Sequence, residues 1–299
     1  MTTLLQVDNL TKKYVNNNVV DAVSFELEEH TATALIGPNG AGKTTTLSML
    51  AGLVSATSGA LQFQGDAKQD IRSIIGFLPQ YPKFFPWLSA LEFTEMAARL
   101  SGVETKQATM DAKKTLEFVG LGDAVNKKTG TFSGGMKQRL GLAQAIVHKP
   151  KLLLLDEPVS ALDPVGRRQV MDLLKELQQK TTILYSTHIL NDAEEMTDQL
   201  LFLRQGKLVE HGSLDEVRTR YAEPRIVIEF EGEQELRRFT EVTKWQMTSK
   251  GLIVSIDIRS EKVEMSSVLS VLSVGKFLVR KVEWQTASLE DIFMKVAVV

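Results

Sequence analysis

Apolar residues recur along the chain with two different spacings, one typical of strands and one typical of helices. Residues 4 to 36 are predicted to be strands, because apolar and polar residues alternate in VSFELE and the apolar run TATALI follows. Unbroken apolar runs return in KLLLLDEP, residues 151 to 158, and in TTILYSTH, residues 181 to 188, as in parallel strands that are covered on both faces. A helical pattern over residues 166 to 179 separates these two runs. The alternation predicts an α/β fold with a parallel sheet between helices.

A helical insert is predicted between residues 89 and 149, within a helical subdomain of about residues 82 to 150. The segment ALEFTEMAARL has the spacing of apolar residues that is typical of a helix. Ser89 and Glu92 stand where the two members of a capping box would begin that helix.

The first domain is expected to comprise residues 1 to 217. Shortly before its end, LLFLRQGKLVEHG, residues 200 to 212, predicts a hairpin of two strands. Its turn is expected at Gln205 and Gly206, which separate the two apolar runs.

Residues 218 to 299 are expected to form a separate accessory domain. The predicted order is strand, helix, two strands, helix and strand, carried by RIVIEF, QELRRFT, KWQMTSKGLIVSIDI, VEMSSVLSVL and FLVRKVEW. That order suggests a small α+β domain of the ferredoxin-like type. In the last segment, SLEDIFMKV, Ser288 and Asp291 are placed to begin a helix. The expected apolar face of this helix contains Leu289, Ile292, Phe293 and Val296.

Composition narrows the classes of function. The 299 residues are 43% hydrophobic and 24% charged, which is ordinary for a globular protein with a sizeable core. A formal net charge of −2 without a stripe of Lys and Arg gives no electrostatic reason to expect nucleic acid. The chain has no cysteine, so disulfides and thiolate metal sites are excluded, as fits a reducing cytoplasm. No segment approaches the roughly 18 consecutive apolar residues of a membrane-spanning helix, and no signal peptide is expected.

A glycine-rich loop follows the apolar run TATALI and is predicted to bind phosphate. GPNGAGKTT fits the pattern G-x-x-x-x-G-K-[ST], in which backbone N–H groups and a helix N-terminus surround the phosphates. Lys43 is expected to reach the β- and γ-phosphates, and the hydroxyl of Thr44 is expected to bind Mg²⁺. The predicted loop residues are Gly37, Pro38, Asn39, Gly40, Ala41, Gly42, Lys43, Thr44 and Thr45.

Acidic and polar residues follow the predicted parallel strands, at the sheet edge where open α/β sheets bind ligands. Asp156 suits Mg²⁺, directly or through water, and Glu157 suits the polarisation of an attacking water. His188 ends the run TTILYSTH and would project over the same edge. Gln80 follows the strand-like IIGFLP, and its amide oxygen is a further candidate Mg²⁺ ligand. Read singly, a histidine in this position is more often a structural residue, and Gln80 would be a surface glutamine.

A second segment has the composition of a phosphate cradle. In FSGGMKQRL, residues 132 to 140, Ser133 and two glycines open a predicted helix. A single nucleotide-binding loop does not explain why the chain carries both.

These motifs, in this order, resemble those of the nucleotide-binding subunit of an ATP-binding cassette (ABC) transporter, over about residues 4 to 217. The resemblance implies a P-loop ATPase fold with a mixed sheet core, an antiparallel β subdomain and a helical subdomain, and it implies ATP and Mg²⁺ as cofactors. It implies that Tyr14 stacks on adenine, Gln80 is the Q-loop glutamine, Asp156 and catalytic Glu157 end the Walker B strand, and His188 is the switch histidine. The signature motif would be FSGGM with Ser133, Gly134 and Gly135, and the D-loop would be SALD, residues 160 to 163, with Asp163. Phe132 and Met136 replace the usual leucine and glutamine of the signature.

The resemblance explains the second cradle. In the family, two subunits meet head to tail, and the signature helix of one subunit points at the γ-phosphate held by the other. Hydrolysis is then expected to open the dimer. The partner copy would be identical or a second ABC ATPase.

The resemblance also implies a separate polytopic membrane permease and a peripheral position at the cytoplasmic face of the cell membrane. The segment YPKFFPWLSALEF, residues 81 to 93, is the expected docking groove for the permease. The alternative is that Phe84, Phe85, Trp87 and Leu88 fill the core of the helical insert. The C-terminal extension and its SLEDIF segment are similar to those of the bacterial exporter-type group, which favours export.

Two other functions remain as alternatives at this point. A soluble ABC ATPase acting on nucleic acid or ribosomes would be expected to have a long coiled-coil insertion or two cassettes, and the sequence has neither. A regulatory subunit without catalysis conflicts with the presence of both Glu157 and His188. The cargo is open, because its path would belong to another polypeptide.

Overall fold

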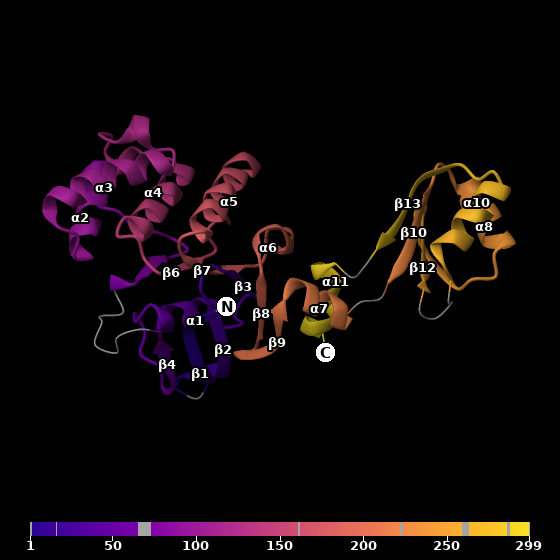
Figure 1. Cartoon of the computed structure of the whole chain (residues 1–299), viewed down its shortest axis with the longest axis horizontal. Helices are drawn as coiled ribbons and strands as arrows, with labels where there is room; N and C mark the ends of the chain where they lie inside the picture. Colours follow the sequence, from indigo (N-terminus) through magenta and orange to yellow (C-terminus); the bar gives the residue numbers. More distant parts are fainter. Residues whose placement is uncertain are drawn as a thin grey trace. The chain divides into compact units, whose positions relative to one another are not determined.

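A computed structural model describes residues 2–15, 17–64, 73–160, 162–221, 224–258, 263–285 and 288–298. The chain divides into two compact units (Figure 1). The first contains residues 1–214 and 296–299, and the second contains residues 215–295.

A six-stranded mixed sheet forms the centre of the first unit. Its order is β5 (Ile75–Leu78), β6 (Leu152–Asp156), β7 (Thr182–Thr187), β3 (Ala32–Ile36), β8 (Gln199–Arg204) and β9 (Lys207–Ser213). All neighbouring pairs are parallel except β8 and β9, which are antiparallel. Every residue of β3, β6 and β7 is buried, so the predicted parallel strands covered on both faces are confirmed.

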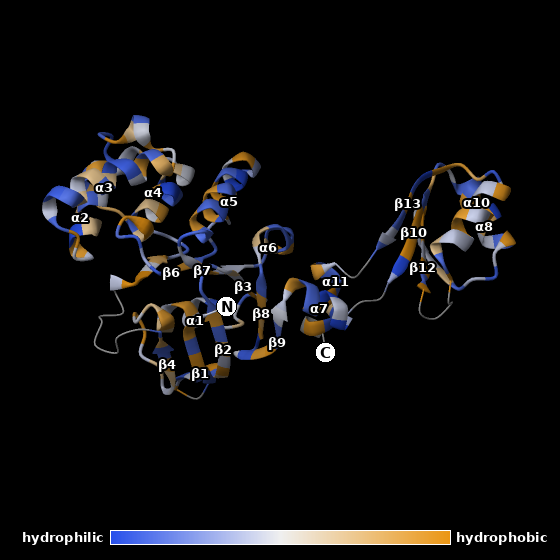
Figure 2. Cartoon of the chain, in the orientation of Figure 1, coloured by the Kyte–Doolittle hydropathy of each residue, from blue (hydrophilic) through white to orange (hydrophobic). Residues whose placement is uncertain are grey.

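A three-stranded antiparallel sheet contributes the second layer of this unit. Its order is β2 (Asn17–Glu28), β1 (Thr3–Tyr14) and β4 (Ser58–Phe63). Alternate residues of β1 and β2 face a hydrophobic core that they share with helix α1 (Lys43–Leu50) and the mixed sheet. Figure 2 shows apolar residues gathered on β1, β2 and α1, where this core lies. The core fixes the helix that begins at Lys43 against the centre of the sheet.

The predicted helical subdomain is present as α2 (Ala90–Leu100), α3 (Thr105–Phe118) and α4 (Gly134–Ile146), with single 3₁₀ turns at Gly122–Ala124 and Thr129–Thr131. The predicted capping box is confirmed at the start of α2. The Ser89 hydroxyl accepts a hydrogen bond from the Glu92 backbone N–H at 3.2 Å, and Glu92 Oε2 accepts one from the Ser89 N–H at 2.7 Å.

The hairpin of β8 and β9 turns where the sequence predicts. Gln205 has φ of 49° and Gly206 has φ of 79°, as a two-residue turn of type I′ requires. Two helices complete the unit, α5 (Pro164–Gln178) and α6 (Leu190–Met196). Helix α6 packs against β3 and β7.

The second unit contains the predicted ferredoxin-like arrangement. Its elements are α7 (Leu214–Tyr221), β10 (Arg225–Phe230), α8 (Glu233–Val242), β11 (Met247–Lys250), β12 (Ile253–Asp257), α10 (Met265–Val274), β13 (Val279–Gln285) and α11 (Leu289–Val298). The first residue of α7 and the end of α11 from residue 296 belong to the first unit. The strand order is β11-β12-β10-β13, and every pair is antiparallel. Phe230, Phe239 and Phe277 lie in its core, with ring centroids 5.2 to 6.4 Å apart.

The predicted start of the last helix is confirmed. The Ser288 hydroxyl accepts a hydrogen bond from the Asp291 N–H at 3.1 Å, and Asp291 Oδ2 accepts one from the Ser288 N–H at 3.1 Å. Leu289 and Ile292 of the expected apolar face are buried. Among the described residues, no helix is both long enough and apolar enough to cross a bilayer.

Candidate functional site

The glycine-rich loop joins the end of β3 to the start of α1, as the phosphate-binding mechanism requires. Gly42 is the N-cap of α1 with φ of 104°, and a Cβ atom there would lie 2.5 Å from the carbonyl oxygen of Val19. A Cβ atom on Gly37 would lie 2.3 Å from the carbonyl oxygen of Leu203. Glycine is therefore required at both positions by the close packing of the loop against the two sheets.

The turn of the β8–β9 hairpin is hydrogen-bonded to this loop. The Gly206 N–H donates to the carbonyl of Ala41 at 3.0 Å, and the Gly206 carbonyl accepts from the Asp21 N–H at 2.8 Å. A Cβ atom on Gly206 would lie 2.7 Å from the carbonyl oxygen of Val19. The sequence signalled the turn, but it gave no sign that the turn contacts the phosphate loop.

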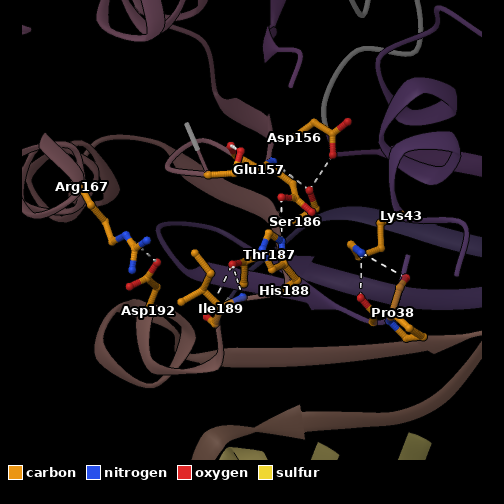
Figure 3. A network of polar contacts seen from close by, with 12 residues as sticks. Pro38, Lys43, Asp156, Glu157, Arg167, Ser186, Thr187, His188, Ile189 and Asp192 are labelled. Carbon is orange, nitrogen blue, oxygen red and sulfur yellow. Dashed lines mark hydrogen bonds and ion pairs between the residues drawn. The ribbon is translucent and has the colours of Figure 1, made fainter. Parts of the chain in front are cut away.

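Lys43 lies beneath the loop and is 6% exposed. Its ammonium group donates to the carbonyl oxygens of Gly37 at 2.7 Å and Pro38 at 3.3 Å (Figure 3). Burial lowers the pKa of Lys43, and the nearby negative charges of Glu157 and Asp156 act in the opposite direction. The structure therefore places the predicted phosphate-binding cation beside the two predicted acids.

The two acids end β6 and are held by the neighbouring strand. Asp156 is 1% exposed, and its Oδ1 atom accepts a hydrogen bond from the Ser186 hydroxyl at 2.6 Å. The same hydroxyl accepts from the backbone N–H of Glu157 at 2.9 Å (Figure 3). Glu157 has φ of 51°, which is uncommon for a residue other than glycine. Sequence reasoning missed Ser186, since its role depends on the register between β6 and β7.

The structure brings Glu157 and His188 together. His188 follows β7, and its Nδ1 atom lies 2.7 Å from Oε2 of Glu157. The Glu157 side chain is 9% exposed, whereas that of His188 is 52% exposed. The Thr187 hydroxyl accepts from the Ile189 N–H at 2.9 Å, which fixes the turn that carries the imidazole. A buried carboxylate in contact with an accessible imidazole can accept and pass on a proton.

The residues after His188 are linked to helix α5. Arg167 of α5 and Asp192 of α6 form an ion pair with 3.9 Å between Nε and Oδ2 (Figure 3). Burial raises the pKa of Asp192, and Arg167 partly opposes this effect. Asp163 is the N-cap of α5, and its Oδ1 atom accepts from the Gly166 N–H at 3.0 Å. Ala161 of the SALD segment lies outside the described residues.

Ser133 begins helix α4, as FSGGMKQRL predicts. Its hydroxyl accepts a hydrogen bond from the Met136 N–H at 3.3 Å, which is the geometry of an N-cap. Phe132 is 5% exposed and fills an apolar position. The Gln138 side-chain amide donates to the carbonyl of Pro158 at 2.7 Å. Gln138 was not predicted, and it connects α4 to the loop that follows Glu157.

A pocket of about 450 Å³ lies beside the start of α4. Its lining includes Ser133, Gly135 and Asp163, so two of the predicted motifs share one surface. The lining residues lie between positions 120 and 166, and the phosphate loop contributes none of them. Within one copy of the chain, the two predicted cradles therefore belong to different surfaces.

The remaining predicted binding residues lie at or just after strand ends and in the phosphate loop itself. Tyr14 ends β1 and is 48% exposed, with Lys12 Nζ 4.9 Å from its ring centroid. Gln80 is half-buried two residues after β5. Thr44 is exposed in the first turn of α1, and Thr45 is half-buried. Pro38, Asn39 and Gly40 are exposed, whereas Gly37, Ala41 and Gly42 are buried.

The donors predicted for Mg²⁺ fit that ion by their chemistry. Thr44, Gln80 and Asp156 offer a hydroxyl, an amide oxygen and a carboxylate, and Mg²⁺ binds such oxygen ligands. Among the described residues, no group of three or more His, Asp or Glu side chains forms a metal cage. Mg²⁺ sites with nucleotides use one or two protein ligands together with phosphate oxygens and water. The donor set therefore suits a nucleotide-bound ion.

The aromatic residues of positions 81 to 93 divide between the interior and the surface. Phe84 is half-buried and makes an edge-to-face contact with the buried Phe93, with centroids 5.0 Å apart. Phe85 is 46% exposed and Trp87 is 65% exposed, with centroids 5.3 Å apart. Tyr81 is 74% exposed. Part of the segment thus completes the helical core, and part presents aromatic surface to solvent.

Comparisons with known proteins agree with this geometry. A family model described as "ABC transporter" matches residues 20–160. A second model, described as "ATP-binding protein DrrA1-3-like, C-terminal domain", matches residues 212–297.

Similar proteins cover almost the whole chain. An uncharacterized ABC transporter ATP-binding protein of Bacillus subtilis (strain 168), YxlF, is 43% identical over 98% of this chain and 99% of its own length. The bacitracin transport ATP-binding protein BcrA of Bacillus licheniformis is 32% identical over 99% of this chain and 97% of its own length.

Solved structures of ATP-binding cassettes resemble about seven tenths of this chain. The ATP-binding subunit of an ABC transporter has a TM-score of 0.67 at 30% identity, covering 73% of this chain and 93% of that chain. A dimeric bacterial ABC transporter cassette has a TM-score of 0.65 at 26% identity, covering 71% of this chain and 99% of that chain.

Proposed function

This chain belongs to the family of ABC transporter ATP-binding proteins, and we propose that two copies hold each ATP between the phosphate loop of one and Ser133 of the other. The chain is an ATPase subunit that powers transport through a separate membrane partner. The observation that carries the proposal is that Ser133 and Asp163 line a pocket to which the phosphate loop of the same copy contributes no residue. The contact between His188 and Glu157, 2.7 Å apart, supports the proposed hydrolysis.

We assign the chemistry of one site to six residues. Lys43 and the loop N–H groups bind the β- and γ-phosphates, for which the present carbonyl partners of Lys43 are exchanged. Glu157 orients the attacking water and accepts its proton, and His188 holds the Glu157 carboxylate in place. Thr44 and Asp156, with Gln80 at the edge, would hold Mg²⁺, which supplies charge neutralisation on the phosphates.

The roles of Tyr14, the signature residues and Asp163 are proposed from their places in the fold. Tyr14 is exposed at the end of β1, where an adenine ring can stack on it. Ser133, Gly134 and Gly135 direct a helix N-terminus and its N–H groups toward the phosphate held by the partner copy. Asp163 lines the pocket beside the start of α4 and completes the proposed interface between the two copies.

The free energy of the hydrogen bonds to ATP is large enough to determine whether the two copies associate. A hydrogen bond to a charged group contributes about 1.5–3 kcal/mol, so two or three per site over two sites contribute about 6–18 kcal/mol. Association costs about 4–15 kcal/mol. Because the two quantities are comparable, loss of the γ-phosphate opens the dimer.

We propose that the membrane partner is a polytopic permease that docks on the exposed rings of residues 81 to 93, at the cytoplasmic face of the membrane. Export is the proposed direction. Relatives are named for bacitracin transport and for linearmycin resistance, which supports this direction. The proposed ATPase domain comprises residues 1 to 217 and the accessory domain residues 218 to 299.

Glu157→Gln tests the proposal. The variant keeps the size of the side chain but removes the proton acceptor, so ATP hydrolysis is expected to fall at least 100-fold while ATP and Mg²⁺ still produce a dimer. Light scattering after gel filtration measures the dimer. Glu95→Gln, on helix α2, is the matched control and is expected to behave as the wild type. A Glu157→Gln protein that stays monomeric with ATP would contradict the shared site.

A further inference from the structure

One buried hydroxyl contacts both acids at the end of β6. Ser186 lies on β7 directly opposite Asp156 in the parallel register, and it is fully buried. Its Oγ atom is 2.6 Å from Asp156 Oδ1 and 2.9 Å from the backbone nitrogen of Glu157. Figure 3 shows Ser186 between these two residues.

The directions of the two hydrogen bonds follow from the groups involved. The Glu157 N–H is a donor only, so it donates to a lone pair of the serine oxygen. The single hydroxyl hydrogen of Ser186 then remains for Asp156 Oδ1, which is an acceptor in an ionised carboxylate. One side-chain oxygen thus fixes one carboxylate oxygen of Asp156 and leaves the other oxygen outside this bond.

The bond to Glu157 acts on an uncommon backbone conformation. With φ of 51°, Glu157 lies in the left-handed region, which persists in a residue other than glycine only when the surroundings hold it. The Ser186 hydroxyl is the partner of the Glu157 N–H, and without it this buried donor would lose its hydrogen bond. The carboxylate of the same residue lies 2.7 Å from Nδ1 of His188.

We infer that Ser186 is a positioning residue that sets the orientation of Asp156 and Glu157 together. The inference rests on the proposed roles of these two acids in ATP hydrolysis. Replacing a residue that orients a metal ligand or a catalytic group through a hydrogen bond typically lowers metal affinity or activity by about 10- to 100-fold. Loss of the hydroxyl at position 186 therefore weakens both metal binding and turnover, and leaves the phosphate loop intact.

The test compares Ser186→Thr with Ser186→Val. These variants have side chains of the same shape, and only threonine keeps the hydroxyl. Relative to Ser186→Thr, Ser186→Val is expected to lower kcat by about 10- to 100-fold and to bind Mn²⁺ more weakly by a similar factor. Mn²⁺ affinity is measured by electron paramagnetic resonance with a non-hydrolysable ATP analogue. KM for ATP, measured at saturating Mg²⁺, should change less than threefold.

Thr182→Val is the matched control on the same strand. Thr182 is 1% exposed, and its hydroxyl accepts from the His30 N–H at 2.9 Å and donates to the Glu28 carbonyl at 3.2 Å. The control therefore removes a buried hydroxyl with the same number of hydrogen bonds, away from the two acids. It is expected to lower the melting temperature without changing kcat or Mn²⁺ affinity.

Equal kcat and equal Mn²⁺ affinity in Ser186→Thr and Ser186→Val would overturn the inference. Should the added methyl group prevent folding of both, Ser186→Ala against the wild type is judged by the same two measurements, with Thr182→Ala as its control. The Glu157→Gln variant distinguishes a failure of the proposed function from a failure of the role inferred for Ser186. Wild-type turnover in Glu157→Gln would refute the proposed function, whereas an inactive Glu157→Gln with no effect of the hydroxyl at 186 refutes this inference alone.

Discussion

The Nδ1 atom of His188 lies 2.7 Å from Oε2 of Glu157, although 31 positions separate the two residues along the sequence. They meet because β6 and β7 are parallel neighbours whose carboxyl ends lie at the same edge of the sheet. The histidine is half exposed and the glutamate is almost fully buried. The imidazole therefore restrains a carboxylate that is almost fully buried.

Replacement of His188 by alanine is expected to lower kcat by about 100-fold, because the Glu157 carboxylate loses the contact that holds it and a positioned general base contributes at least about 100-fold. ATP affinity should remain close to that of the wild type, because Lys43 and the phosphate loop are untouched. Single-turnover hydrolysis and equilibrium binding of a fluorescent ATP analogue measure the two quantities. His211→Ala, at an exposed position on β9, is the control. Full turnover in His188→Ala would remove His188 from the proposed mechanism.

The Ser133→Arg variant tests whether the second cradle acts on the nucleotide of the partner copy. The long side chain of arginine at the start of α4 fills the space in which a phosphate would approach the helix N–H groups, and it leaves the phosphate loop unchanged. One copy is expected to bind ATP as the wild type does, while the ATP-dependent dimer and cooperative hydrolysis are lost. Analytical ultracentrifugation and the dependence of turnover on protein concentration measure both effects.

Ser270→Arg is the matched control, because Ser270 is an exposed serine on α10 of the second unit. It is expected to leave dimerisation and hydrolysis unchanged. If Ser133→Arg hydrolyses ATP with the cooperativity of the wild type, the signature segment does not complete the partner's site.

Local signals in the sequence were sufficient for much of the fold and for the segments that make up the candidate site. The capping box at Ser89 and Glu92, the turn at Gln205 and Gly206, and the strand order of the second unit follow from neighbouring residues and from element order. The phosphate loop is readable because its glycines, lysine and threonine act within one short segment.

Contacts between distant segments account for what the sequence did not reveal. Ser186 is joined to Asp156 only through the register of β6 and β7, and Gln138 is joined to Pro158 only through the packing of α4. The contact of Gly206 with Ala41 requires the hairpin to lie under the phosphate loop. The left-handed conformation of Glu157 has no local signature, since the residue is neither glycine nor asparagine.

The capping box at the start of α2 makes a prediction about pH. Hydrogen bonds from the Ser89 backbone and side chain, together with Lys128, lower the pKa of Glu92 to about 2. Because this folded-state pKa lies below the ordinary value of 4.5, the contribution of Glu92 to stability is present above about pH 4.5 and is lost as the pH falls toward 2. Glu92→Gln removes the charge and keeps the shape, so its melting temperature should be lower than that of the wild type at pH 7.

The difference in melting temperature between Glu92→Gln and the wild type should shrink steadily below pH 4.5. Differential scanning calorimetry from pH 7 to pH 3 measures it. Glu95→Gln is an exchange of the same kind on the same helix, without a place in the capping box. A difference for Glu92→Gln that is independent of pH would mean that the charge of Glu92 is not what stabilises the start of α2.

Trp87→Ala tests the proposed docking of the permease. The Trp87 side chain is 65% exposed and contacts Phe85, so its removal exposes no core and should change the free energy of unfolding by at most about 0.5 kcal/mol. Loss of a buried aromatic anchor from an interface typically costs 2 kcal/mol or more, which is about a 30-fold loss of affinity. Co-purification of the permease in detergent and ATP-driven transport in vesicles should therefore both decline, while ATP hydrolysis by the purified chain is unchanged.

Trp284→Ala, which removes a 53% exposed tryptophan from the second unit, is the control. If Trp87→Ala retains full transport and co-purification, the exposed rings of residues 81 to 93 are not the docking surface, and the contact of Phe84 with Phe93 would then account for the aromatic content of this segment.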